Sequence, residues 1–273
     1  MTDQRENMPT FLFIGGQRCG SSWVHKCLAE HPDVFTATPK EVHYFNRNYE
    51  KGDRWYLDHF RDAGQAHAIG EVTPDYIADP QCPERVHALC TDLKLVAVLR
   101  EPIERAHSLY RLKLGTTMPY NTFNEAVEKH PDMVEHGHYA EHLERWWSCF
   151  PREQMLVLLY EDLVRSDAET IRKIYEHIGV RSDFVPSWIG KTDNAAVFPS
   201  LRAKLRRAGL DPLVKAIGRS FIGDRIRARV NAKKKNADGI EIDPELRRSL
   251  DAHYKPHNDR LRSILGRPLE NWS

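Results

Sequence analysis

Short apolar runs alternate with amphipathic stretches along the first 180 residues of this chain. The apolar runs predict strands that are buried on both faces, as in a parallel sheet, and they lie at 11–14, 33–37, 68–72, 93–99 and 154–163. Apolar residues at helical spacing predict helices at 21–30, from 102 onward, at 138–148 and at 168–178. Strands that alternate with helices predict an α/β fold of three layers, in which helices flank a central, mostly parallel sheet.

Beyond residue 182 the pattern becomes helical and basic, and a last helix is expected at 244–265. Residues 200–236 contain twelve Lys or Arg and two acidic residues, a net charge of +10, whereas the whole chain carries +1 and the remainder therefore about −9. A solvated helical face is the default interpretation of such a segment. Two alternatives are the guidance of an anionic acceptor or donor and a transient contact of 202–235 with an anionic membrane surface.

Length and composition indicate the size of the domain and the cellular compartment of the protein. A chain of 273 residues with 41% hydrophobic content can bury the core of one large domain, or of a domain with a small subdomain. Its five cysteines are an odd number without a C-x-x-C pair, which argues against a disulfide framework or a zinc site and favours a reducing compartment. The polar N-terminus and the lack of a long apolar run predict a soluble, cytoplasmic protein.

The first predicted strand leads into a glycine-rich turn, Gly15-Gly16-Gln17-Arg18-Cys19-Gly20, and then into a helix that Ser21 and Ser22 can cap. Free N–H groups and the positive end of the helix dipole make such a junction an anion-binding site. The spacing of Gly15 and Gly20 matches an NTP-binding loop, but Ser21 stands where that loop has lysine. Because Arg18 supplies the cation instead, the turn favours a single 5′-phosphate over a magnesium-bound terminal phosphate.

Two further groups of polar residues follow predicted strands. Lys40, Glu41 and His43 come just after the second strand, which we expect to lie beside the anion-binding turn. Arg100 ends the fourth strand and Ser108 lies on the next helix, so the pair predicts a second anion clamp. In open parallel sheets ligands bind at the carboxyl ends of the strands, where both groups are expected.

Three segments in this order resemble the PAPS-dependent sulfotransferase family, in particular its carbohydrate branch of heparan sulfate sulfotransferases and their bacterial relatives. They are GGQRCGSS at 15–22, PKEVHYF at 39–45 and LREPIERAHSLY at 99–110, and the likeness resumes in YKPHNDRL at 254–261. The resemblance implies a P-loop-like fold and a single sulfotransferase domain over 1–273. Within it, 10–180 would form the nucleotide-binding core and 182–273 a helical, basic C-terminal part.

The resemblance also implies roles for individual residues. The 5′-phosphosulfate of 3′-phosphoadenylyl sulfate (PAPS) would be held by Arg18, Cys19, Gly20, Ser21, Ser22 and Trp23, and the 3′-phosphate by Arg100 and Ser108. Glu41 matches the catalytic base and His43 an active-site histidine. Arg18 would stabilise the leaving oxygen of the bisphosphate product (PAP), while Lys40 or His43 would orient the sulfuryl group. Fixed cations and N–H groups are expected to suffice, so no metal is predicted.

The acceptor is expected to be a hydroxyl or amine of a small molecule, a glycan or a glycolipid. A P-loop kinase or NTPase is the alternative, and it would require magnesium and ATP. A non-catalytic nucleotide- or polyanion-binding protein is a third possibility, although no nucleic-acid-binding module is present and no nucleic-acid partner is expected.

Other polar residues have simpler interpretations. His136, His138 and His142 invite a metal site, but a single i,i+4 histidine pair is more typical of a surface. Glu71 and Asp75, around the third strand, are expected to line the acceptor site.

Overall fold

The computed structural model describes residues 8–114, 117–191 and 241–272. Its centre is a sheet of five parallel strands in the order β2-β3-β1-β4-β5. The strands are β1 Phe11–Gly15, β2 Val34–Thr36, β3 Ala68–Val72, β4 Lys94–Leu99 and β5 Met155–Leu159. The predicted α/β architecture is therefore confirmed, and the sheet is parallel throughout.

The strands are apolar because helices cover both faces of the sheet. Leu12 and Ile14 of β1 pack into the hydrophobic cluster on one face, whereas Phe11 and Phe13 pack into the cluster on the other. All four side chains are at most 1% exposed. Alternation along a strand thus divides one apolar run between two cores, which explains why the run has no polar interruption.

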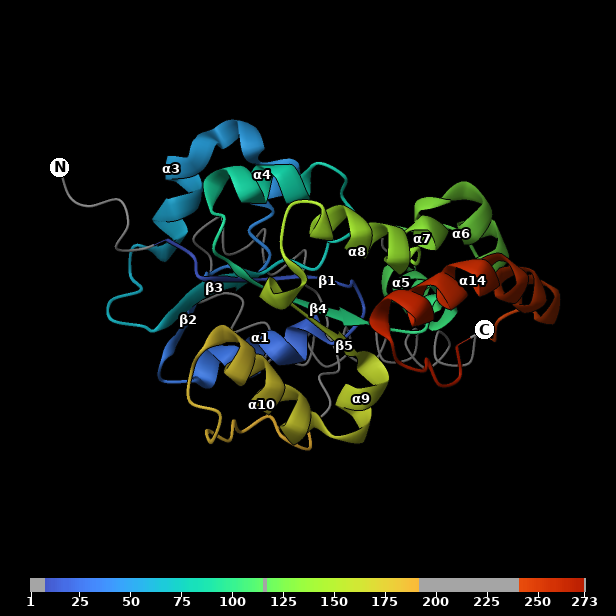
Figure 1. The fold of residues 1–273 in the computed structure, drawn as a ribbon. Helices are drawn as coiled ribbons and strands as arrows, with labels where there is room; N and C mark the ends of the chain where they lie inside the picture. The colour runs from blue at the N-terminus through green and yellow to red at the C-terminus, as the bar shows by residue number, and fades with distance from the viewer. Residues whose placement is uncertain (1–7, 115–116, 192–240, 273) are drawn as a thin grey trace, which may run out of the picture.

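Helices form the outer two layers (Figure 1). They are α1 Ser21–Glu30, α2 Tyr44–Arg47, α3 Gly52–Leu57, α4 Cys82–Leu89, α5 Pro102–Lys113, α6 Phe123–Lys129, α7 Asp132–Glu135, α8 Tyr139–Trp147, α9 Tyr160–Arg165, α10 Asp167–Ile178 and α14 Pro244–Leu265. Within the described ranges, 3₁₀ turns lie at Tyr49–Lys51, Asp58–Phe60 and Arg152–Gln154. Helices α1, α9 and α10 cover one face, and α3, α4 and α8 cover the other.

Beyond the carboxyl ends of the strands, α5, α6, α7 and α14 share a third hydrophobic cluster (Figure 1). Leu250 and Tyr254 of α14 are buried in it, while Leu261, further along the same helix, joins the core on the α8 face of the sheet. The predicted last helix is confirmed at 244–265, and it packs back onto the sheet region. Among the helices that the structure describes, none combines the length and apolar character needed to cross a membrane.

The sheet order corrects one expectation about the site. Strand β2 pairs with β3, and β3 lies between β2 and β1, so the segment after β2 does not follow a strand next to the glycine-rich turn. From β1 the chain passes to the edge strand β2, returns to place β3 between β2 and β1, and then crosses to place β4 on the other side of β1. The connections therefore change direction between β1 and β4. The space beyond the carboxyl ends of these two strands is the switch point at which α/β sheets bind ligands.

The strand predicted at 154–163 is wrong in its second half. Strand β5 ends at Leu159 and α9 begins at Tyr160. Glu161 and Asp162 lie in the first turn of α9, where negative charge suits the helix dipole, and Glu161 accepts the Glu101 N–H at 3.1 Å. The apolar run continues into the helix because Leu163 is buried there.

Candidate active site

The turn between β1 and α1 has the geometry of an anion-binding site. Helix α1 begins at Ser21 with Gly20 as its N-cap, so the predicted capping by Ser21 and Ser22 is wrong. Gly20 has φ +90°, and a Cβ there would lie 3.2 Å from Leu163 Cδ1, so the position favours glycine. No side chain caps the helix. The N–H groups of Ser21, Ser22 and Trp23 in its first turn, which have no intrahelical acceptors, are therefore available to an anion.

Two predicted donor-binding residues have side chains that belong to the core. Cys19 is 0% and Trp23 4% exposed, and the Trp23 indole donates to the Trp188 carbonyl at 3.1 Å. Burial raises the pKa of Cys19 to about 12, so its thiol is uncharged. Any contact that these two residues make with a nucleotide must come from their backbone.

The structure brings the two predicted anion clamps into direct contact. Arg18 Nε donates to Ser108 Oγ at 3.1 Å, and Arg100 Nη1 donates to the Arg18 carbonyl at 3.5 Å. Burial, followed by the charge of Arg100, lowers the pKa of Arg18. The Arg100 guanidinium lies 4.8 Å from the centre of the Tyr160 ring and 3.9 Å from Glu104. Two neighbouring guanidinium groups at the end of the sheet form an electropositive site for an anion.

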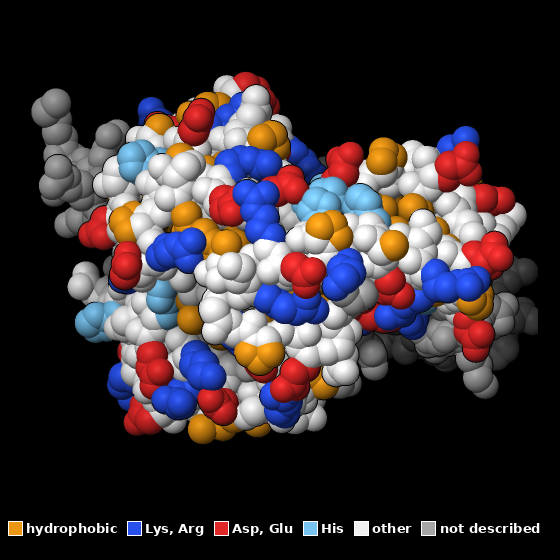
Figure 2. Space-filling model, turned by 45° about the vertical axis from the view of Figure 1, so that its right-hand side comes forward, with side chains coloured by type: hydrophobic (Ala, Val, Ile, Leu, Met, Phe, Trp, Pro, Cys, Tyr) orange, Lys and Arg blue, Asp and Glu red, His pale blue; other side chains and the backbone are white. Residues whose placement is uncertain are grey.

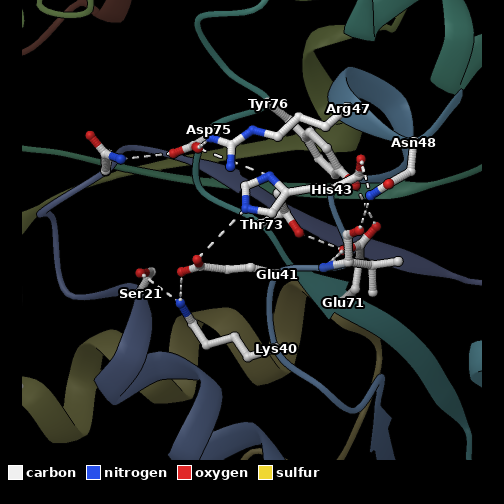
Figure 3. A network of polar contacts seen from close by, with 12 residues as sticks. Ser21, Lys40, Glu41, His43, Arg47, Asn48, Glu71, Thr73, Asp75 and Tyr76 are labelled. Carbon is white, nitrogen blue, oxygen red and sulfur yellow. Dashed lines mark hydrogen bonds and ion pairs between the residues drawn. The ribbon is translucent and has the colours of Figure 1, made fainter. Parts of the chain in front are cut away.

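The Lys40–Glu41–His43 group lies next to Ser21, at the end of the same turn (Figure 3). Lys40 Nζ donates to Ser21 Oγ at 3.3 Å and contacts Glu41 Oε1 directly. His43 Nε2 lies 3.8 Å from Glu41 Oε2. Lys40 therefore brings a cation beside the residue that occupies the lysine position of an NTP-binding loop, although it comes from a different segment of the chain.

Glu41 is held as a carboxylate in a strained loop. Burial opposes its charged form, but the hydrogen bond with His43 and the charge of Lys40 outweigh burial and lower its pKa to about 2. Glu41 and His43 have φ angles of 66° and 55°, in the left-handed region that residues other than glycine seldom adopt. Such strain persists where surrounding contacts fix it, and it is common in functional sites.

Glu71 supplies part of that support, and its predicted place beside the acceptor is wrong. Its side chain is 1% exposed and accepts from the Val42 N–H at 3.3 Å. The hydroxyls of Thr73 and Tyr76 donate to it at 2.6 and 2.9 Å. Glu71 therefore fixes the loop that carries Glu41, because it binds the backbone N–H of Val42, the next residue (Figure 3).

Asp75 joins residues that sequence reasoning missed. Gln17 Nε2 donates to it at 3.0 Å, Arg47 Nη2 lies 2.6 Å away, and His43 Nδ1 lies 4.0 Å away. Asp75 thus links the glycine-rich turn to the loop that carries Glu41. The available signals were the place of Gln17 inside the turn and that of Arg47 one helical turn after His43. The stacking of Tyr160 on Arg100 had no sequence signal.

The histidines that suggested a metal site behave differently from the sequence expectation. His142 is buried rather than on the surface, and its Nε2 lies 3.1 Å from the Glu135 carbonyl. Burial lowers its pKa to about 3, so its ring is neutral at pH 7. His138 instead lies beside His253 and His257 of α14.

The fold and this site define a class: a P-loop-like α/β protein whose anion-binding turn is joined by a carboxylate and several fixed cations. Residues 9–205 match the family model described as Sulfotransferase domain, and the chain belongs to that family.

Curated relatives share sequence along nearly the whole chain. Human heparan sulfate glucosamine 3-O-sulfotransferase 3B1 is 29% identical over 270 residues, which cover 96% of this chain and 64% of that protein. Mouse bifunctional heparan sulfate N-deacetylase/N-sulfotransferase 4 is 26% identical and is covered over 31% of its length. A crystal structure of a sulfotransferase from Alicyclobacillus acidocaldarius has the same fold, with a TM-score of 0.73, 22% identity and coverage of 97% of this chain and 98% of that one.

Proposed function

We propose that this protein transfers the sulfuryl group of PAPS to a hydroxyl or amine of a carbohydrate-bearing acceptor and releases PAP. One observation carries the proposal. Lys40 connects Glu41 to Ser21 at the start of α1, and Arg18, in the glycine-rich turn just before α1, contacts Ser108 and Arg100. A proton acceptor and sites for two anionic groups therefore share one edge of the sheet, as a bisphosphate-containing donor requires.

Donor binding uses the two anion clamps. The first-turn N–H groups of Ser21, Ser22 and Trp23, with the backbone of Cys19 and Gly20, receive the 5′-phosphosulfate. Arg100 and Ser108 receive the 3′-phosphate. Arg18 lies between them, because its side chain bonds to Ser108 while its backbone belongs to the turn. From this position Arg18 stabilises the charge that develops on the leaving phosphate oxygen.

Glu41 removes the proton of the acceptor group as that group attacks sulfur in line with the leaving oxygen. In the ligand-free site Lys40 and His43 stabilise the carboxylate and make it a weak base, with a pKa of about 2. When the sulfuryl oxygens arrive, Lys40 transfers its contact from Glu41 to them, and the pKa of Glu41 rises. The base thus becomes effective only when the donor is in place. His43 keeps the carboxylate oriented.

The acceptor class rests on the relatives, whose names specify heparan sulfate glucosamine O-sulfation and N-sulfation. An amino sugar in a glycan is therefore the acceptor that we favour, with small molecules and glycolipids as further candidates. The basic segment 202–235, for which a membrane contact was considered, lies outside the described residues. All five cysteines are among the described residues and are free thiols, which supports a reducing compartment such as the cytoplasm.

The decisive experiment compares Glu41→Gln with the wild type in a labelled-sulfate assay on amino-sugar oligosaccharides, alongside calorimetry with PAP. Loss of the base should lower turnover by about 100-fold or more, while the Kd of PAP stays near the wild-type value. Glu50→Gln, an exposed carboxylate nearby, is the matched control and should retain full turnover. Near-normal turnover of Glu41→Gln removes Glu41 from its role. Tighter binding of magnesium–ATP than of PAP would favour the kinase alternative.

A further inference from the structure

Three histidines from two helices meet at the surface of the molecule. His138 is the N-cap of α8, and His253 and His257 lie one turn apart on α14. Nε2 of His138 lies 2.9 Å from Nε2 of His253, and the rings of His138 and His257 are stacked with their centres 3.9 Å apart. One ring nitrogen from each of the three lies within 4.8 Å of the others. Histidine side chains form a contiguous patch on this face (Figure 2).

The surroundings prepare these rings to act as ligands. Glu141 Oε1 lies 3.1 Å from His257 Nδ1, a contact that leaves Nε2 of His257 for another partner. A carboxylate on the second ring nitrogen is the usual support of a metal-binding histidine.

We propose that His138, His253 and His257 bind a divalent transition metal ion, with zinc as the ion that suits the site best. Imidazole nitrogens are ligands for zinc, nickel and copper, and three of them with one water complete a tetrahedral zinc site. Nitrogens about 2.0 to 2.1 Å from zinc are roughly 3.4 Å apart, so side-chain rotations suffice to close the observed spacing of up to 4.8 Å.

The bound ion would be structural. His138 precedes α8, whereas the two other ligands lie on α14, more than a hundred residues later in the chain. The ion would therefore fasten the last helix to the N-terminus of α8, beside the contact that the buried Tyr254 of α14 makes with the Val134 carbonyl of α7. Sulfuryl transfer as proposed above uses other residues, so the two proposals can fail independently.

The test uses the full-length chain without a histidine tag, after removal of metals with EDTA. Zinc and, separately, nickel are titrated by calorimetry, and thermal unfolding is followed with and without zinc. We expect one saturable site for each metal and a rise in Tm of about 5 °C at saturating zinc. The exposed His253 allows His253→Ala to test the ligand set with little risk to folding.

Three variants distinguish a built site from a surface contact. His253→Ala should weaken zinc binding about 100-fold and abolish the rise in Tm, and Glu141→Gln should weaken binding about 10-fold by freeing the His257 ring. His67→Ala, at an exposed histidine elsewhere, should change nothing. Zinc binding weaker than about 1 mM overturns the proposal, and so does binding that His253→Ala leaves intact.

Discussion

Glu71 supports the loop that carries Glu41, and replacing it tests how far the conformation of that loop controls turnover. The buried carboxylate accepts from the Val42 N–H and from the hydroxyls of Thr73 and Tyr76. Burial raises the pKa of Glu71, and the hydrogen bonds from Thr73 and Tyr76 oppose that rise. Burying a carboxylate costs free energy, and the three hydrogen bonds that Glu71 accepts offset that cost. All three donors depend on this one side chain for the bond.

The expected magnitudes follow from those donors. Glu71→Gln keeps the size of the side chain but turns one acceptor oxygen into a donor, so at least one buried donor loses its partner, which costs about 1 to 3 kcal/mol. Glu71→Ala removes all three bonds and leaves a cavity, which costs about 3 to 5 kcal/mol. Because Val42 is no longer fixed, Glu41 shifts, and a displacement of about 1 Å lowers kcat roughly 10- to 100-fold.

Urea unfolding gives the free energy of unfolding, and the labelled-sulfate assay gives kcat. Calorimetry with PAP should show a nearly unchanged Kd, since the glycine-rich turn is outside the network. Tyr175→Phe is the control for stability alone: its buried hydroxyl donates to the Cys27 carbonyl at 3.0 Å, and losing that bond costs about 1 kcal/mol without changing kcat. If Glu71→Gln lowers stability but leaves kcat unchanged, Glu71 does not position Glu41. If Glu71→Gln leaves the free energy of unfolding unchanged, the three hydrogen bonds do not contribute the stability that we assign to them.

Three further predictions concern the donor site, the charge of the base and the sheet. Ser108→Ala should weaken PAP binding about 10-fold or more in calorimetry, because a hydrogen bond to a charged group is lost. The pKa of Glu41, about 2, lies below the value of 4.5 for an unperturbed glutamate, so its contacts with His43 and Lys40 stabilise the fold above about pH 4.5. The difference in unfolding free energy between wild type and Glu41→Gln should therefore shrink as the pH falls from 4.5 toward 2 in urea titrations. Gly70→Ala would place a Cβ 2.2 Å from the Phe11 carbonyl and should destabilise the sheet by about 1 to 3 kcal/mol, measured by thermal unfolding.

Local signals in the sequence were enough for the five strands and for helices α1, α5, α8, α10 and α14, but not for α4 or α6. Apolar runs located the strands, because burial on both faces leaves no choice of side chain. Gly179, with φ +78°, ends α10 as expected, and Pro102 begins α5. The order of the three motifs identified the anion-binding turn and the candidate base. Errors occurred where neighbouring elements compete, as at β5, whose apolar run continues into a helix.

Only the tertiary structure decided which of these residues meet. The contact of Lys40 with Ser21, the bond from Arg18 to Ser108 and the histidine cluster join residues that are 19, 90 and 115 positions apart. Hydrophobic periodicity reports whether a side chain is buried, but it contains no information on which distant polar group lies opposite. The packing of the layers sets those partners, and it also buries Glu71 beneath the loop that carries Glu41. Local sequence thus determines the helices and strands, whereas the packing of these elements determines which polar residues meet in the site.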